Sequence, residues 1–211
     1  MDDFTHSNIA SKKLVEMLSI TGGSLLDIGS GMGQHSDYFE RNGFEVTAID
    51  IVIPQGCIHP PSHKISFDMF FNSSLCSKYE IVWASHVLEH QRNVGTFLTK
   101  CRRVMKESGL LVITVPPFKH NIVGGHLTAW NAGLLLYNLV LAGFDCSRAK
   151  VLSYGYNISV MVECPTDFVT IAINDLPLKY DCGDIEIIAP YMPEGCRKQS
   201  FNGEIKELNW N

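Results

Sequence analysis

The sequence predicts an α/β domain built on a doubly wound, mostly parallel sheet, and three observations lead to this fold class. A short apolar run around Asp27 leads into three glycines spaced one residue apart, Gly29, Gly31 and Gly33, and a helix-like pattern follows. A second β-prone run, 44–50, ends in an acid. Beyond it, β-prone and helix-like segments keep alternating, which indicates parallel strands covered by helices on both faces.

The individual elements follow from local patterns along the chain. A helix is expected over 7–19, and 51–63 is expected to be a loop because it holds three prolines and two histidines. Asn131 is a suitable N-cap for a helix that ends at Gly143, and Gly155-Tyr156 suits a hairpin turn. The apolar positions of the first helix are Ile9, Leu14, Met17 and Leu18. The expected strands are 24–28, 44–50, 64–68, 79–85, 109–115, 149–154 and 157–164, and a further helix is expected over 90–106.

Composition and charge exclude several classes of protein. At 211 residues, with 45% hydrophobic residues, the chain suits one domain with a substantial core. The net charge of −5 and the lack of a basic run argue against nucleic acid as a partner. No apolar stretch is long enough to span a bilayer, and the N-terminus lacks the features of a signal peptide. The seven cysteines form no C-x-x-C motif, so we expect reduced thiols in a cytoplasmic protein rather than disulfides or a zinc site.

The glycine-rich turn has the chemistry of a small-ligand site. Glycine allows the backbone to approach a ligand where a side chain would collide with it. The spacing D-x-G-x-G-x-G differs from the G-x-G-x-x-G of dinucleotide-binding loops, and Asp27 would repel a pyrophosphate but suits an amine-bearing ligand. Asp50 follows Gly33 by 17 residues, and its carboxylate offers two acceptor oxygens for the hydroxyls of a ribose.

With this spacing, residues 25–34 resemble the nucleotide-binding loop of class I S-adenosylmethionine (SAM)-dependent methyltransferases. Residues 79–90 are similar to the fourth strand and following turn of that superfamily, and 109–116 to its fifth strand. Residues 126–130, with the helix that runs into 142–144, are similar to a late segment of small-molecule and sugar methyltransferases. The resemblance covers about residues 20–165. It implies a Rossmann-like, seven-stranded sheet with an antiparallel last strand in a SAM-binding domain over 1–165, and an accessory C-terminal segment, 166–211, packed on it.

The resemblance also implies how SAM is bound, at the carboxyl ends of the parallel strands. Asp27 would lie near the amine of SAM, and Asp50 would hold the ribose. Asp68 would accept the adenine amine and Met69 would lie against the ring, unless Asp68 is only a solvated turn acid. After the fourth strand, Ser85 and His86 would face the methionine moiety, unless His86 is a hydrogen-bonded structural histidine. The loop residues along the methionine and ribose would be Gly29, Ser30, Gly31 and Gly33.

The segment from His86 to His90 also matches H-x-x-E-H, a zinc-protease signature. Such a site needs both histidines on one helix face and a third protein ligand. Because His86 directly follows an expected buried strand, we expect it to precede the helix, and no metal is predicted. Glu89 and His90 are instead expected to orient the loop over the cofactor or to line the acceptor pocket.

Transfer of a methyl group to an alcohol oxygen gains from a base, and histidine titrates near neutral pH. His126 is the first candidate for this base and His90 the second, and the other reading of His126 is that it pins its loop to the following helix. His120 is a further candidate for contact with the acceptor. The hairpin residues that would face the acceptor, unless the turn is simply solvated, are Tyr154, Tyr156 and Asn157.

These expectations combine into a SAM-dependent methyltransferase that methylates oxygen in a small hydroxylated acceptor, such as a nucleotide-sugar or surface-polysaccharide precursor. Two alternatives stay open: N- or O-methylation of another small metabolite or natural product, and a SAM-binding module without turnover. No nucleic acid and no membrane insertion is expected. The C-terminal segment, in which 167–173 and 185–189 are β-prone, is expected to cap the core or to contribute to a homo-oligomer.

Overall fold

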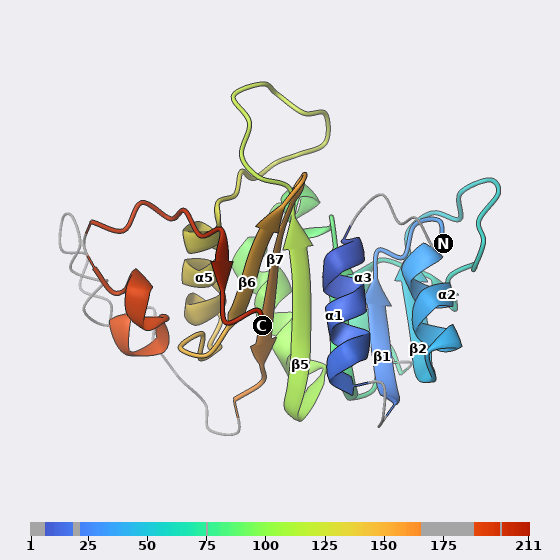
Figure 1. Ribbon diagram of the computed structural model, residues 1–211. Helices are drawn as coiled ribbons and strands as arrows, with labels where there is room; N and C mark the ends of the chain where they lie inside the picture. Colours follow the sequence, from blue (N-terminus) through green and yellow to red (C-terminus); the bar gives the residue numbers. More distant parts are fainter. Residues whose placement is uncertain (1–6, 19–21, 75, 166–187, 199) are drawn as a thin grey trace.

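The computed structural model describes residues 7–18, 22–74, 76–165, 188–198 and 200–211. These ranges hold one eight-stranded sheet of order β3-β2-β1-β4-β5-β7-β6-β8, flanked by helices (Figure 1). The predicted α/β fold class is confirmed, with eight strands in place of the expected seven. In the first half the elements are α1 (Asn8–Leu18), β1 (Gly23–Ile28), α2 (Gln34–Arg41), β2 (Phe44–Asp50), β3 (His63–Lys64), α3 (Phe67–Phe71), β4 (Tyr79–Ser85), η1 (Leu88–His90) and α4 (Val94–Arg103). In the second half they are β5 (Met105–Val115), α5 (Ala132–Leu141), β6 (Lys150–Tyr154), β7 (Asn157–Glu163), η3 (Ala189–Tyr191), η4 (Glu194–Cys196) and β8 (Glu207–Leu208).

The sheet directions bring the carboxyl ends of six strands, β1 to β6, to one edge. β1 pairs in parallel with β2 and β4, β2 with β3, and β4 with β5. β7 is antiparallel to both β5 and β6, so β6 runs in the direction of β5. The hairpin turn Gly155-Tyr156 therefore lies at the same edge, as the sequence predicted. We call this edge the carboxyl edge.

Two hydrophobic clusters lie on opposite faces of the sheet because successive strand residues point to opposite sides. On β4, Ile81 and Trp83 belong to the cluster beneath α1 and α2, whereas Val82 and Ala84 belong to the cluster beneath α3, α4 and α5. Trp83 is fully buried and meets Phe39 of α2 edge-on, with 5.0 Å between ring centroids. Both faces are thus covered, which explains why the central strands read as continuous apolar runs.

The third strand was predicted wrongly. Strand 64–68 was expected, but β3 covers only 63–64, and 67–71 form the short helix α3. The reason is local, since the Ser66 hydroxyl accepts a hydrogen bond from Met69 N at 3.2 Å and caps the helix. The predicted loop 51–63 is confirmed over 51–62, where the structure contains no helix or strand, while His63 begins β3.

Two other boundaries differ from the prediction, as does one helix face. The expected helix 90–106 begins at Val94, because the side chain of Asn93 caps it by accepting from Thr96 N at 3.0 Å. β5 begins at Met105, four residues before the expected start. In α1 the expected apolar face is only partly buried, since Ile9 and Met17 are each 40% exposed. The residues of α1 that are buried are Ala10, Ser11 and Leu14.

The end of the chain supplies the extra strand. β8 pairs with β6 in antiparallel fashion at the edge of the sheet, and Trp210 beyond it is buried. The β-prone stretch 167–173 lies outside the described residues, as does most of 185–189, whose last two residues lead into η3. Within the described ranges, none of the helices has the length and apolarity that a membrane span requires.

Candidate active site

The glycine-rich turn after β1 is shaped to bring backbone close to a ligand. Gly29, Gly31 and Gly33 all have positive φ values, of +74°, +54° and +78°. A Cβ on Gly29 would lie 2.4 Å from Val87 Cγ2, and one on Gly33 would lie 2.0 Å from His59 O. Among the described residues, nothing lies within 4 Å of a Cβ on Gly31, so these residues leave open space above the middle of the turn. In this part of the chain the turn has room for a ligand at Gly31 and none for side chains on Gly29 and Gly33.

Asp50, at the end of β2, borders this open space. Its Oδ2 accepts from Gly31 N at 2.8 Å, and its Oδ1 accepts from Val52 N at 2.9 Å. Each carboxylate oxygen has two lone pairs, so both keep an acceptor position after these bonds. The acid is held in place by backbone donors and still suits a pair of ribose hydroxyls, which supports a nucleoside beside Gly31.

Asp27 is the buried acid of the site, with 2% of its surface exposed. Burial raises the pKa of Asp27 to about 6, against the hydrogen bond from the Ser36 hydroxyl at 2.6 Å, while the nearby Asp50 carboxylate adds to the rise. A cationic amine near Asp27 would favour its ionised form, so the residue fits the amine of SAM. Ser36 was not among the residues predicted from the sequence, although its position on the first turn of α2 could have indicated it.

Asp68 and Met69 are not at the end of a strand, contrary to the expectation. Both lie in α3, and the Asp68 side chain is largely exposed and pairs with Lys100 Nζ at 2.8 Å. Met69 is also exposed. Their contact with adenine stays a prediction.

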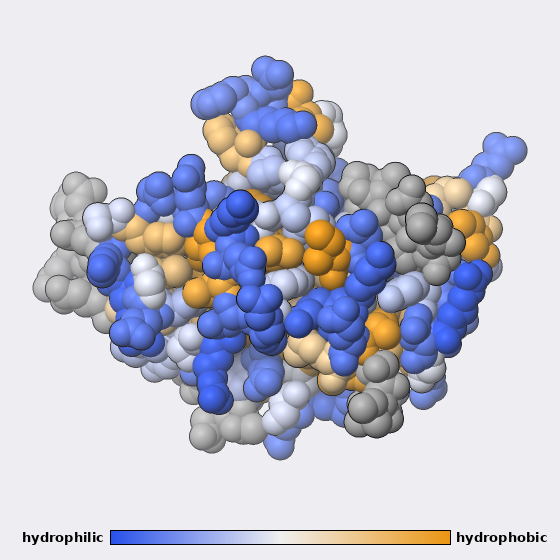
Figure 2. Space-filling view, in the orientation of Figure 1, coloured by the Kyte–Doolittle hydropathy of each residue, from blue (hydrophilic) through white to orange (hydrophobic). Residues whose placement is uncertain are grey.

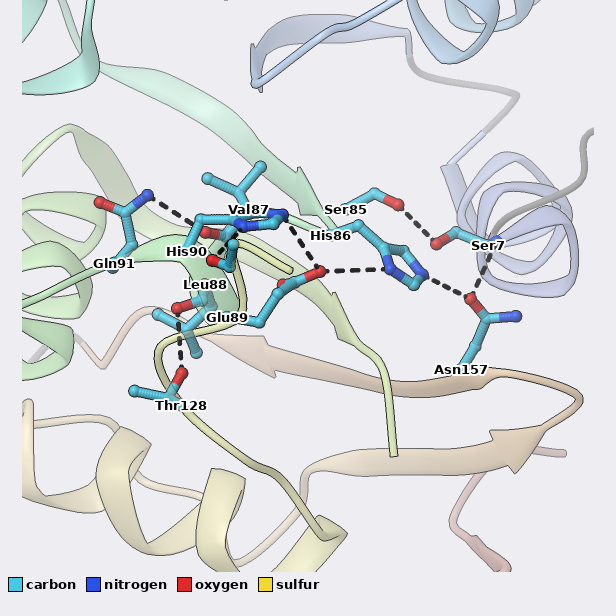
Figure 3. Close-up of polar contacts among 11 residues, drawn as sticks. Ser7, Ser85, His86, Val87, Leu88, Glu89, His90, Gln91, Thr128 and Asn157 are labelled. Carbon is cyan, nitrogen blue, oxygen red and sulfur yellow. Dashed lines mark hydrogen bonds and ion pairs between the residues drawn. The ribbon is translucent and has the colours of Figure 1, made fainter. Parts of the chain in front are cut away.

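Hydrogen bonds connect the end of β4 with Ser7, just before α1, and with β7 (Figure 3). The hydroxyls of Ser85 and Ser7 lie 2.6 Å apart, and Ser7 N donates to Asn157 Oδ1 at 3.4 Å. The same Oδ1 lies 2.9 Å from His86 Nε2, and His86 Nδ1 lies 3.3 Å from Glu89 Oε1. Burial alone would lower the pKa of His86, but its contacts with Glu89 and Asn157 outweigh burial and raise it.

His86 is also held in an unusual backbone conformation, with φ of +54°. A non-glycine residue in this region costs free energy and persists only where its surroundings hold it. Here the Glu89 and Asn157 contacts on both ring nitrogens do so. The structure therefore favours the alternative that His86 is a hydrogen-bonded structural residue. It lies beside the glycine-rich turn, because the next residue, Val87, packs against Gly29.

Glu89 and His90 form hydrogen bonds with the loop 116–130, which joins β5 to α5. The Glu89 side chain is fully buried between His86 Nδ1 and His90 Nε2, at 3.3 and 3.8 Å. Its backbone oxygen accepts from Leu127 N at 2.7 Å, and His90 Nδ1 lies 2.8 Å from Gly125 O. These contacts fix the position of the loop, and that Glu89 and His90 orient it over the cofactor stays a prediction.

His126 lies on this loop, with its ring edge-on to His90 at 5.1 Å between centroids. It lines a pocket of about 270 Å³ together with His120 and Tyr156. Potential ligand atoms of Glu89, His90 and His126 all lie within 4.8 Å of one another. The H-x-x-E-H helix site is not formed, because His86 precedes η1 in the positive-φ region, so the group that comes together differs from the motif.

Of the hairpin residues, only Tyr156 lines this pocket. The Tyr154 hydroxyl accepts from Ala10 N at 3.3 Å and lies 3.1 Å from Ser159 Oγ, which places it toward α1. Tyr154 and Asn157 line another pocket, of about 680 Å³, which residues 202–206 also line. The carboxyl edge thus carries a glycine turn, two acids and a loop pocket with an imidazole.

Comparison with known proteins identifies this arrangement. A family model described as "Methyltransferase domain" matches residues 5–138. A ubiquinone biosynthesis O-methyltransferase of Rhodopseudomonas palustris (strain BisA53) is 31% identical over 102 residues, which are 45% of this chain and 40% of that protein. A protein of the same name from Cereibacter sphaeroides is 29% identical over 121 residues, 52% of this chain and 49% of that one. These matches span about half or less of the relatives' length.

Solved structures share the fold. A Burkholderia thailandensis 1,6-didemethyltoxoflavin-N1-methyltransferase with bound S-adenosylhomocysteine superposes with a TM-score of 0.61 at 20% identity, covering 76% of this chain and 78% of that one. N-methyltransferase NodS from Bradyrhizobium japonicum has a TM-score of 0.58 at 16% identity, covering 78% and 99%. With the family match over most of the chain, and a turn and acids that fit the cofactor, this protein belongs to the class I SAM-dependent methyltransferases.

Proposed function

We propose that the protein transfers the methyl group of SAM to a hydroxyl oxygen of a small acceptor bound beneath the loop 116–130. The observation that carries this proposal is His126, whose imidazole lines the 270 Å³ pocket at the carboxyl edge. Within the described residues, its ring makes an edge contact with His90 but no hydrogen bond. The ring nitrogens thus stay available to an acceptor. The relatives named as O-methyltransferases support oxygen as the methylated atom.

SAM supplies an electrophilic methyl group, and the transfer is an in-line displacement that depends on holding the two reacting atoms in alignment. In the proposal, Asp27 faces the amine of SAM and Asp50 holds its ribose. The loop from Gly29 to Gly33 lies along the cofactor. In this loop the buried hydroxyl of Ser30, which has no hydrogen-bond partner among the described residues, is available to the cofactor. Ser85 and His86 position the methionine end.

His126 acts as the general base in this proposal. It takes the proton of the acceptor hydroxyl, and the buried Glu89 carboxylate lies 3.8 Å from Nε2 of the neighbouring His90.

The first acceptor to test is an aromatic hydroxyl. Phe118, Trp130 and Tyr156 line the pocket, and aromatic side chains suit a flat ring. Relatives named for ubiquinone biosynthesis support the same class. The nucleotide-sugar acceptor predicted from the sequence is the second to test.

Turnover with His126→Ala tests the role of the base. With catechol or UDP-glucose as acceptor, we expect turnover to fall about 10²–10⁴-fold, the usual contribution of a positioned base. Calorimetric affinity for SAM should stay near that of the wild type. His63→Gln, on the edge strand β3, is the matched histidine control.

A folded His126→Ala protein with normal turnover would reject the base role, and His90→Ala would be tested next. If His126 only anchors its loop, its loss should instead lower thermal stability, and His126→Asn should restore it. SAM binding without methylation of any hydroxylated acceptor would favour an N-methyltransferase or a SAM-binding module.

A further inference from the structure

Lys119, His120 and His126 line the pocket beneath the loop 116–130, and among the described residues that line it none is Asp or Glu. The buried Glu89 lies behind this wall, with a carboxylate oxygen within 4.8 Å of a ring nitrogen of His126. This composition contrasts with the chain as a whole, which carries a net charge of −5. The ammonium of Lys119 in this pocket of an acidic protein attracts negative charge.

Lys119 is the charged residue of this pocket. Its Nζ lies over the ring of Tyr156, 3.9 Å from the centroid, in a cation–π contact. Across the ranges 7–18, 22–74, 76–165, 188–198 and 200–211, no acid forms an ion pair with Lys119. The aromatic ring positions the ammonium group without neutralising it, so its charge remains available to a ligand.

Lys119 also projects from an anchored part of the loop. Next to it, Phe118 N donates to Trp130 O at 2.7 Å, and the far side of the loop is fixed to Glu89 and His90. Figure 2 shows this loop projecting from the molecule with hydrophilic and hydrophobic surface together. The side chain of Lys119 and the loop that carries it are therefore already ordered before a ligand binds, which lowers the entropic cost of binding.

The basic pocket lies next to the reaction centre. The ring of Tyr156 is 6.3 Å from the ring of His86, which directly follows β4 at the carboxyl edge. His126 lines the same pocket as Lys119. One small molecule could therefore contact Lys119 with one group and present a hydroxyl to His126 with another.

We propose that this pocket binds an anionic group of the acceptor, a carboxylate or a phosphate, and that Lys119 determines this specificity. The inference rests on the proposed function, since it narrows the acceptor class. The ammonium of Lys119 pairs with the anion, while Tyr156 holds the lysine from beneath. His120 offers a further donor to the anion, while His126 faces the hydroxyl.

Calorimetry in the presence of S-adenosylhomocysteine tests this, using two pairs of ligands that differ in charge. The carboxylate pair is 3,4-dihydroxybenzoate and 3,4-dihydroxybenzamide, and the phosphate pair is glucose 1-phosphate and methyl glucoside. The measured quantity is the ratio of Kd values within each pair. We expect the wild type to prefer the charged member of one pair, and the responding pair identifies the anion. Lys119→Gln should reduce that preference about 10- to 100-fold, which corresponds to the loss of a hydrogen bond to a charged group.

Two further variants complete the design. Lys119→Arg keeps the charge and the aromatic contact, so it should retain most of the preference. Lys12→Gln, an exposed lysine on α1, removes the same charge elsewhere and should leave the ratio unchanged. Circular dichroism and thermal unfolding establish that each variant is folded.

Equal affinity, or no measurable affinity, for the charged and neutral members of both pairs in the wild type would overturn the proposal. A preference that survives Lys119→Gln would overturn it as well. The proposed function fails separately: Lys119-dependent anion binding without any O-methylation would reject the function and keep this site. Methylation of neutral acceptors, with no preference for charged ones, would keep the proposed function and reject the anion site.

Discussion

Replacing Asp27 by Asn should stabilise the protein in the absence of SAM, although Asp27 is proposed to contact the cofactor. The carboxyl is buried, and burial raises its pKa from 3.8 to about 6. Between these two pH values the folded state keeps the proton that the unfolded state has lost. The folding free energy that Asp27 contributes is therefore lost as pH rises through this window, and the loss is complete above pH 6.

The size of the effect follows from the pKa. Each power of ten in the ionisation constant is worth about 1.4 kcal/mol, so the rise from 3.8 to about 6 corresponds to about 3 kcal/mol at neutral pH. Asn is uncharged and keeps an oxygen that can accept from the Ser36 hydroxyl. Asp27→Asn should thus be nearly neutral at pH 4 and stabilising by up to about 3 kcal/mol at pH 7.5.

Urea denaturation of the wild type and Asp27→Asn at pH 4, 5, 6 and 7.5 measures this difference. Asp145→Asn is the matched control, because Asp145 is exposed and accepts from Ser147 N, a bond that Asn can also accept. Its effect should not change with pH. A difference between Asp27→Asn and wild type that is constant with pH, or one that makes the variant less stable at pH 7.5, would refute the reasoning.

Two other predictions concern the cofactor and metals. Asp50→Ala should weaken SAM binding by roughly 1.5–3 kcal/mol in calorimetry, the range for hydrogen bonds to a charged group. Asp50→Asn should lose less affinity because it keeps an acceptor. An unchanged affinity, or preferential binding of NAD, would contradict the assignment of the ribose site. Elemental analysis of the purified protein should find no stoichiometric zinc, because the side chains of Glu89 and His90 already have protein partners. Glu89 lies 3.3 Å from His86 Nδ1, and His90 Nδ1 lies 2.8 Å from Gly125 O. One zinc per chain that is lost in His126→Ala would instead assign Glu89, His90 and His126 as its ligands.

Local signals predicted the features that depend on neighbours in sequence. The glycine turn follows from the steric freedom of glycine, and all three glycines have positive φ. Asn131 caps α5 through Leu134 N, and Gly155-Tyr156 turns β6 into β7, because caps and hairpin turns are set by a few adjacent residues. Where a local signal was overlooked, as with Ser66 before α3, the strand prediction was wrong and Asp68 was misplaced.

The sequence by itself thus predicted the α/β fold class, the alternation of most strands and helices, and the family resemblance, but not α3 or β8. Only the tertiary structure decided which distant residues meet: Ser7 with Asn157, 150 residues apart, and β8 with β6 at the edge of the sheet. It also placed Lys119 on Tyr156 and His126 beside His90. Such contacts leave no periodic or turn signal in the chain, because they arise from packing between elements whose sequences are independent of each other.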